Sequence, residues 1–458
     1  MEINIGNNIR ISHPTKELSR WVAFNLEIDN PDFYKKQQMG KSTYNTPRTL
    51  RLYERVGDNI KIPFGCIRDI WGFIKDSPYN VNICPIRRLE YRSSINLYPY
   101  QNNAVNEALK AKNGILVMPC GSGKTQSGLE IIARLGGRAL WLTHTQDLLN
   151  QSKARAEAVL ECGTGTITAG KVNIGTHITF ATVQTLSKID LTDYRDYWDV
   201  IIVDECQHCA GTPTRVTQFY RVVSQLSARY KIGLTATPKR ADGLEKAMFT
   251  LLGGVIYEVS RDEVKHTTCP IKVQKVETGW QPNYDLVLMG DGTIDYSKIV
   301  DDMIHNDARY DVVMGKLATL DGAMIVLANR VEYLQRLCRN TGYGKRCVCL
   351  SGMGQSKKVK AERKEALRKL NNGEIDCIFA TYQLAKEGLD VPNLRYVVFA
   401  TPERDETTVI QSVGRVGRKA EGKEYGTVID FIDDFGMYKG WAKVRDKYYK
   451  RLDAEILY

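Results

Sequence analysis

The sequence predicts an α/β protein in which two parallel-sheet units follow one another, preceded by a small α+β domain. At 458 residues, the chain is long enough for three domains of about 150 residues each. From residue 113 onward, short apolar runs of strand length alternate with longer amphipathic segments. This alternation is typical of parallel strands that are buried on both faces and joined by helices. The runs form two series, one at Ile115–Met118, Ala139–Leu142, Val200–Val203 and Ile232–Leu234, the other at Met324–Leu327, Cys347–Leu350, Cys377–Phe379 and Tyr396–Phe399.

The two series predict one α/β unit at residues 96–265 and a second at 266–458. Residues 254–300 are rich in Gly and Thr and lack a clear helical period, which indicates the junction between these units. Residues 1–95 have another pattern, because a short helix near Trp21 and Leu26 is followed by turn-rich sequence. We therefore expect residues 1–95 to form an N-terminal α+β accessory domain. The second unit ends in a predicted helix with apolar residues at helical spacing, Trp441, Val444, Tyr448 and Leu452.

Composition excludes several classes of protein. Hydrophobic residues make up 43% of the chain, which rules out global disorder. No apolar run approaches the roughly 18 residues of a membrane span, and the start of the chain does not resemble a signal peptide. We expect a soluble cytoplasmic protein. The eleven cysteines include two close pairs, Cys206/Cys209 and Cys347/Cys349. Structural zinc normally needs two correctly spaced pairs, and the one-residue gap of the second pair is too short, so no structural zinc is expected.

The charge of the chain favours a nucleic-acid partner. The formal net charge is +11, and residues 1–95 contain 15 basic and 10 acidic side chains, a surplus of +5 in the first fifth of the chain. A basic protein suits nucleic acid, although net charge bears on association rather than on fold or activity.

A phosphate-binding loop is predicted at Pro119–Thr125, between a predicted strand and a predicted helix. Its glycines permit a tight turn whose backbone amides face phosphates. Lys124 can reach the β- and γ-phosphates, and the Thr125 hydroxyl can hold Mg²⁺. Met118 stands where the usual pattern has its first Gly, so only the core of the pattern is present. The loop residues assigned to nucleotide binding are Gly121, Ser122, Gly123, Lys124 and Thr125.

Two adjacent acids supply the metal-holding group that such a loop requires. Asp204 and Glu205 directly follow the apolar run Val200–Val203. We expect Asp204 to hold Mg²⁺ and Glu205 to orient and deprotonate the attacking water.

In their order along the chain, these segments resemble motifs of superfamily 2 helicases. Pro119–Thr125, Asp204–Gln207, Thr235–Pro238 and Gln411–Arg418 resemble motifs I, II, III and VI, and the resemblance covers roughly residues 97–435. Within the superfamily, the chain looks most like XPB-like and phage branch-migration helicases. It departs from the XPB-like pattern at Arg240-Ala-Asp242, where the middle acid is missing.

The resemblance implies two RecA-like domains that bind ATP and Mg²⁺, and it implies roles for particular residues. Arg415 and Arg418 resemble arginine fingers, and Gln411 a γ-phosphate contact. Either Gln207 or His208 is expected to couple the nucleotide site to Thr235 and Thr237. The remaining implied residues are Tyr98, Gln101, Gly388 and Asp390 for the nucleotide, and Thr143, Thr182, Gln184, Arg240 and Thr381 for the nucleic acid.

A second nucleic-acid contact is predicted in the N-terminal domain. Lys35, Lys36 and Lys41 are interleaved with the aromatic residues Phe33, Tyr34 and Tyr44, which suits base stacking combined with phosphate contact. A solvated loop explains the same pattern equally well. Because few residues separate Asp390 from Gln411, a strand-separating wedge fits better in residues 1–95.

The sequence therefore predicts an ATP-dependent DNA helicase or translocase that unwinds or branch-migrates forked or junction DNA. Such an enzyme belongs to DNA recombination and repair, here as a monomeric motor in the cytoplasm, which includes that of a phage-infected host cell. Two alternatives stay open. One is a double-stranded DNA translocase that does not separate strands, and the other is an RNA helicase or an ATP-gated RNA-binding switch.

Overall fold

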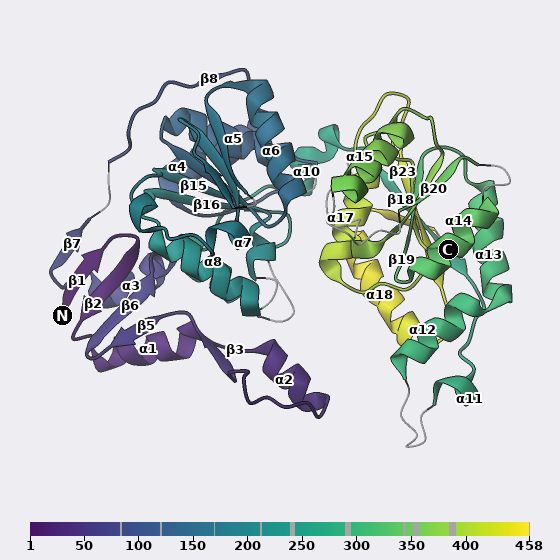
Figure 1. Ribbon diagram of the computed structural model, residues 1–458, viewed down its shortest axis with the longest axis horizontal. Helices are drawn as coiled ribbons and strands as arrows, with labels where there is room; N and C mark the ends of the chain where they lie inside the picture. The colour runs from purple at the N-terminus through teal and green to yellow at the C-terminus, as the bar shows by residue number, and fades with distance from the viewer. Residues whose placement is uncertain are drawn as a thin grey trace. The chain divides into compact units, whose positions relative to one another are not determined.

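The computed structural model divides the chain into two compact units, Met1–Ser260 and Arg261–Tyr458, and each is described by itself (Figure 1). The described residues are 1–82, 85–119, 121–168, 170–210, 213–238, 243–288, 295–341, 345–350, 357–383 and 391–457. Within these ranges, no helix combines the length and the apolar character needed to cross a bilayer.

The first unit is built around an eight-stranded sheet in the order β13-β12-β14-β10-β15-β16-β9-β17. All neighbouring strands pair in parallel except β12 and β13. The four apolar runs of the first series lie in β9, β10, β15 and β16, which confirms the predicted parallel sheet. The strands are β9 (Asn113–Val117), β10 (Ala139–Thr143), β12 (Thr164–Thr168), β13 (Lys171–Asn173), β14 (Ile178–Thr182), β15 (Val200–Asp204), β16 (Tyr230–Thr235) and β17 (Val255–Glu258).

Helices cover both faces of this sheet, as a parallel sheet requires. Figure 1 shows α4 (Pro99–Ala111), α5 (Lys124–Leu135) and α6 (Gln146–Val159) on one face. The other face is covered by α7 (Val183–Leu186), α8 (Pro213–Gln225) and α9 (Glu245–Leu252), whose apolar residues share one buried cluster with the sheet. In α5, a Cβ at Gly128 would lie 2.8 Å from the Trp141 ring, so only glycine allows the helix to approach the sheet this closely.

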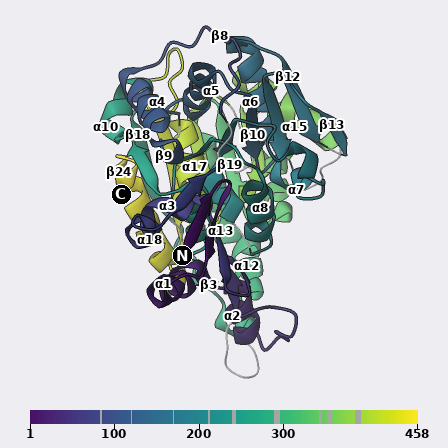
Figure 2. The same cartoon turned by 90° about the vertical axis from the view of Figure 1, so that its left-hand side faces the viewer.

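The N-terminal residues form a separate, mainly antiparallel sheet in the order β5-β6-β2-β1-β7. A hairpin of β3 and β4 and the short helix α2 extend away from this sheet (Figures 1 and 2). Asn30 begins α2 by accepting a hydrogen bond from the Asp32 amide, and Pro31 occupies the first helical position. The elements are β1 (Glu2–Ile5), β2 (Asn8–Ser12), α1 (Lys16–Leu26), β3 (Glu27–Asp29), α2 (Pro31–Gln38), β4 (Thr49–Arg51), β5 (Glu54–Val56), β6 (Asn59–Pro63), α3 (Ile67–Ile74) and β7 (Tyr79–Val81).

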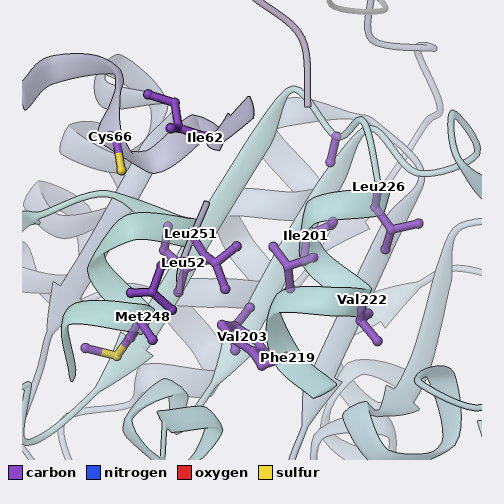
Figure 3. Packing of buried hydrophobic residues seen from close by; sticks show 14 of the residues in the cluster. Leu52, Ile62, Cys66, Ile201, Val203, Phe219, Val222, Leu226, Met248 and Leu251 are labelled. Atoms are coloured by element: carbon purple, nitrogen blue, oxygen red, sulfur yellow. The ribbon is translucent and has the colours of Figure 1, made fainter. Parts of the chain in front are cut away.

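The N-terminal sheet and the eight-stranded sheet share one apolar core. Figure 3 shows Leu52, Ile62 and Cys66 in the same cluster as residues of α8 and α9 such as Val222 and Leu251. The approach is close, because a Cβ at Gly65 would lie 2.3 Å from the Thr250 carbonyl oxygen. Polar contacts also cross the seam, since Asn8 Nδ2 donates to the Ser224 carbonyl at 2.7 Å. The N-terminal residues thus pack within the same compact unit as the eight-stranded sheet.

The second unit contains a seven-stranded parallel sheet in the order β20-β21-β19-β22-β23-β18-β24. The second series of apolar runs lies in β19 to β22, as predicted. Residues 254–300 are not merely a junction, because they contain the sheet strands β17 and β18. The elements are α10 (Arg261–Val264), β18 (Ile271–Glu277), α11 (Tyr284–Val287), α12 (Tyr296–His305), α13 (Asp307–Thr319), β19 (Met324–Ala328), α14 (Val331–Thr341), β20 (Cys347–Leu350), α15 (Lys357–Asn371), β21 (Cys377–Thr381), β22 (Tyr396–Phe399), α17 (Glu406–Val416), β23 (Gly426–Ile432), α18 (Gly436–Arg451) and β24 (Glu455–Leu457).

A buried ion-pair cluster ties α18 to this sheet. Asp430 in β23 is fully buried and accepts hydrogen bonds from Arg445 at 2.7 Å, Lys275 at 2.8 Å and the Tyr449 hydroxyl at 3.0 Å. Burial would raise the pKa of Asp430, but Arg445 and Lys275 together hold it below its ordinary value. The predicted C-terminal helix is therefore anchored by charge as well as by its apolar residues.

Lys231 in β16 is a buried cation and makes the stability of the first unit depend on pH. Its ammonium donates to the Val223 carbonyl at 3.2 Å, and burial lowers its pKa to about 7. In the unfolded chain the pKa is about 10.4, so between pH 7 and 10.4 the unfolded chain binds more protons. The free energy of unfolding should therefore rise with pH in this range. We expect Lys231→Met to remove this rise, worth up to about 5 kcal/mol at 1.36 kcal/mol per pKa unit.

This prediction is checked by urea unfolding of the full chain at several pH values. The exposed Lys246→Met is the matched control, because it removes a lysine of the same unit that is already solvated in the folded chain. The prediction would be contradicted if the free energy of unfolding of Lys231→Met rose with pH as steeply as that of the wild type.

Candidate nucleotide and nucleic-acid site

The predicted phosphate loop connects β9 to α5 at the carboxyl edge of the sheet. Gly121 and Gly123 both have φ of +81°, a left-handed conformation that glycine adopts without strain. A Cβ at Gly123 would also lie 2.3 Å from Gln101 Nε2, so another residue there would displace the Gln101 amide. Lys124 is the first residue of α5, and its neighbour Thr125 lies in the first turn. Phosphate bound here would meet the amino end of a helix, where backbone amides point outward.

The segment before α4 holds the phosphate loop in place. Gln101 Nε2 donates to the Ser122 carbonyl at 2.7 Å, and Gln101 Oε1 accepts from the Tyr98 amide at 2.8 Å. The Tyr100 hydroxyl donates to the same Ser122 carbonyl at 3.1 Å. Tyr98 lies against Tyr100 in a stacked pair and is 47% exposed. The Gln101 side-chain amide therefore positions the loop, and the partly exposed Tyr98 ring lies beside it.

Asp204 and Glu205 lie at the carboxyl end of β15, next to the phosphate loop. Lys124 Nζ is 3.4 Å from Glu205 Oε1, and both side chains are largely buried. Glu205 has φ of +48°, which is rare for a residue with a side chain and costs of order 1 kcal/mol. The turn that gives Glu205 this conformation directs its carboxylate toward Lys124 rather than along the strand.

The two acids have opposite electrostatic environments. Burial, followed by the charge of Glu205, raises the pKa of Asp204 to about 7. Burial would also raise the pKa of Glu205, but Lys124, Gln207 and His208 bring it below its ordinary value. The Asp204 carboxylate and the Thr125 hydroxyl are hard oxygen donors of the kind that Mg²⁺ prefers, and a cation there would keep Asp204 ionised. These residues fit a magnesium ion.

Gln207 connects Glu205 to the end of β16. Its side-chain amide donates to Glu205 Oε2 at 2.7 Å, and its oxygen accepts from the Thr235 hydroxyl at 2.5 Å. The Thr237 amide in turn donates to Thr235 Oγ1 at 3.0 Å. Gln207 is 1% exposed, so these bonds are shielded from water. Gln207, one of the two residues considered for this connection, contacts Thr235 directly.

His208 faces the other neighbouring strand. Its ring stacks on His144, with centroids 4.1 Å apart and planes 27° apart. His144 follows Thr143 at the end of β10, and its carbonyl accepts from Gln184 Nε2 at 3.1 Å. Gln184 itself follows Thr182 at the end of β14. The structure therefore brings Thr143, Thr182 and Gln184, the expected nucleic-acid contacts of this unit, to the same edge as the two acids.

The expected contacts of the second unit lie on α17 and at the ends of strands. Gln411 and Arg415 lie on α17, which begins with the Asp405 cap accepting from the Thr408 amide at 2.8 Å. Arg418 follows the helix and forms a backbone bridge with Thr268. Thr381 ends β21 and is buried. Three expected site residues, Arg240, Gly388 and Asp390, lie outside the described residues.

The basic residues of the N-terminal domain lie on the extension formed by α2 and the following loop, residues 31–48. Lys35 and Lys41 are exposed, whereas Lys36 donates to the Thr46 hydroxyl at 2.6 Å. Tyr44 is 94% exposed. The structure thus places the predicted basic and aromatic side chains on one projecting element.

Three residues of the site were not singled out from the sequence: His144, Ser152 and Tyr100. Ser152 Oγ lies 3.4 Å from Asp204 Oδ2, and Tyr100 contacts the phosphate loop as described above. All three fall inside or directly beside recognised motifs, so their positions could have been considered. Their partners, however, lie 22 to 64 residues away in sequence, and no local pattern indicates such contacts.

The chain matches two families of known proteins. The family described as "Type III restriction enzyme, res subunit" matches residues 94–240, and "Helicase conserved C-terminal domain" matches residues 308–420. The chain is 25% identical over 364 residues to the DNA 3'-5' translocase XPB2 of Sulfurisphaera tokodaii, covering 72% of this chain and 80% of that protein. The chain belongs to the superfamily 2 helicases.

Two further proteins are similar to the chain. A mimivirus protein that carries the name of an ATP-dependent RNA helicase is 25% identical over 390 residues, covering 81% of this chain and 70% of that protein. The solved structure of yeast Dbp5 bound to RNA matches the fold with a TM-score of 0.57 at 16% identity, covering 86% of this chain and 94% of Dbp5. As a superfamily 2 helicase, the chain is an ATP-dependent enzyme that acts on nucleic acid as a helicase or translocase.

The helicase site generates a test of Glu205. We expect Glu205 to accept the proton of the attacking water. An amide in place of its carboxylate keeps the shape but cannot do this, so Glu205→Gln should lower the kcat of ATP hydrolysis by about 10²–10⁴-fold. The steady-state ATPase rate with nucleic acid present measures this. Glu258→Gln, at an exposed position in β17, should hydrolyse ATP like the wild type. An unimpaired Glu205→Gln enzyme would show that another group activates the water.

Proposed function

We propose that this helicase is a DNA motor that uses ATP hydrolysis to unwind or branch-migrate forked or junction DNA. The observation that carries the proposal is the hydrogen-bonded connection from Lys124 through Glu205 and Gln207 to Thr235. It connects the ATP-binding loop to the segment that resembles helicase motif III through buried contacts of 2.5–3.4 Å. The basic extension of the N-terminal domain supports a further DNA contact outside the motor.

We assign the chemistry of the nucleotide site to residues of the first unit. The amides of Gly121–Gly123 and the Lys124 ammonium hold the phosphates, and Tyr98 stacks on the base. Glu205 orients the attacking water and accepts its proton. Thr125 and Asp204 would hold Mg²⁺, which neutralises phosphate charge when bound.

The second unit supplies four further groups under this proposal. Gln411, Arg415 and Arg418 take the γ-phosphate contact and finger roles that the resemblance implies, and Thr381 contacts the nucleic acid. An arginine finger contributes about 10³–10⁵ in rate in other phosphoryl-transfer enzymes.

The N-terminal extension is proposed as the element that recognises the branch. Its exposed Lys35 and Lys41 suit phosphate, and the 94% exposed Tyr44 suits a base or a strand end. Deleting residues 1–95 is a poor test of this role. Leu52, Ile62 and Cys66 belong to the core that covers the eight-stranded sheet, so the deletion would expose apolar surface of the motor itself. Substitution on the extension avoids this problem.

Two other functions remain as alternatives. The name of the Sulfurisphaera relative favours translocation along DNA, which does not require strand separation. The name of the mimivirus relative favours RNA as the substrate.

The ATPase rate of the full chain should distinguish these substrates. We expect forked or four-way DNA to stimulate hydrolysis more strongly than linear duplex, and RNA to stimulate it least. Strand displacement from a fork, compared with triplex displacement from a duplex, separates unwinding from translocation alone. Strongest stimulation by RNA would overturn the DNA assignment, and triplex displacement without fork unwinding would establish the translocase.

The extension is tested by neutralising its three lysines together. Lys35→Gln/Lys36→Gln/Lys41→Gln should weaken forked-DNA binding and reduce the slope of log K against log salt by about 0.9 for each phosphate that the variant no longer neutralises. Fluorescence anisotropy at several salt concentrations measures both quantities. Lys16→Gln/Lys75→Gln, at exposed positions of the same domain outside the extension, should leave the slope close to that of the wild type. An unchanged slope in the triple variant would remove the extension from the DNA path.

A further inference from the structure

The first unit presents its functional segments in a fixed spatial order along one sheet edge. The strand order β14-β10-β15-β16-β9 differs from the order of these strands in the chain. All four pairings are parallel, so the carboxyl ends of the five strands lie side by side. The phosphate loop follows β9, and Asp204 ends β15 with Glu205 directly after it. Of the expected nucleic-acid contacts, Thr143 ends β10, Thr182 ends β14, and Gln184 follows β14. Strand β15 therefore lies between the ATP loop and the nucleic-acid segments.

Contacts connect each strand end to the next along this edge. The Met118 amide after β9 donates to the Thr235 carbonyl of β16 at 2.8 Å. Thr235 contacts Gln207 after β15, and Gln184 after β14 contacts the His144 carbonyl after β10. Between β15 and β10, the stack of His208 on His144 joins the segments that follow the two strands.

Each histidine of the stacked pair is held by a hydrogen bond to a different segment of the sheet edge. The His208 amide donates to the Glu205 carbonyl at 2.9 Å, which fixes the His208 backbone to the catalytic turn. The His144 backbone is held from the other side by Gln184. Both rings are partly buried, and their nearly parallel planes with centroids 4.1 Å apart put them in direct contact. The stack thus joins the segment that follows Glu205 to the end of β10, where Thr143 and His144 lie.

We propose that the His144–His208 stack is the mechanical link by which the nucleotide site and the nucleic-acid surface of the first unit influence each other. This inference rests on the proposed function, because it assigns a positioning role within the same motor. In this proposal, Gln207 connects the nucleotide site to Thr235, and His208 connects it to the ends of β10 and β14. Neither histidine contacts the reacting atoms in this assignment.

A positioning role of this kind is measured as a coupling between two binding events. The Kd of the full chain for labelled forked DNA is determined without nucleotide and with a non-hydrolysable ATP analogue. The ratio of the two Kd values is the coupling, which is typically about 5- to 150-fold in allosteric proteins. The Kd for nucleotide must change by the same factor when DNA is bound. We expect His144→Ala and His208→Ala each to bring this ratio close to 1.

Additional variants separate the stack from other effects. The double variant His144→Ala/His208→Ala should reduce the coupling no further than either single variant, because both remove one interaction. His208→Phe keeps an aromatic ring without the imidazole and should retain most of the coupling. His177→Ala is the matched control, since His177 precedes β14 at the opposite end of the strands and contacts Tyr91. Its ratio should equal that of the wild type.

The possible results separate a failure of this inference from a failure of the proposed DNA function. Wild-type coupling in either single alanine variant, or additive reductions in the double variant, would overturn the inference and leave the proposed function intact. A reduction in His208→Ala and His208→Phe alike, with none in His144→Ala, would show that His208 acts through Glu205 and would also overturn it. A wild-type ATPase that no DNA stimulates would instead overturn the proposed DNA function, and this inference with it.

Discussion

Parallel pairing of β9, β16, β15, β10 and β14 is the constraint on which the first unit's site depends. Parallel strands end at the same edge, so segments that follow different strands meet even when they are far apart in the chain. The phosphate loop, the Asp204–Glu205 turn and Thr235 come together for this reason. A shift in the register of one strand would move its carboxyl end by a full residue and break the 2.5–3.4 Å contacts between neighbours.

The turn after β15 requires an unusual backbone conformation. Glu205 adopts a left-handed conformation, and its carboxylate is held between Lys124 and Gln207. These contacts offset the local strain and also lower the pKa of the acid, whereas burial raises the pKa of Asp204 beside it. One short turn thereby gives two adjacent carboxylates different protonation behaviour, which suits a metal ligand next to a proton acceptor.

The N-terminal domain shows how an accessory element can belong to a motor unit. It has its own sheet, but Leu52, Ile62 and Cys66 cover the face of the eight-stranded sheet that α8 and α9 also cover. Its extension, residues 31–48, contributes little to that core and instead carries exposed basic and aromatic side chains. The sheet of this domain therefore contributes to the core, whereas its extension carries the exposed basic and aromatic side chains.

The sequence alone determined the eight apolar strands, the two-unit α/β organisation and the helicase motifs, because these features depend on local periodicity and on residues adjacent in the chain. From residue type and neighbours it also predicted roles for Lys124, Asp204 and Glu205, and the structure places Lys124 beside Glu205. Only the tertiary structure decided that Gln207 contacts Thr235 while His208 stacks on His144. Those partners are 28 and 64 residues away. Residues 207 and 208 are adjacent in the chain, and their side chains point toward different neighbouring strands. Which strand each one meets follows from the order of strands in the sheet, a long-range property that no local pattern contains.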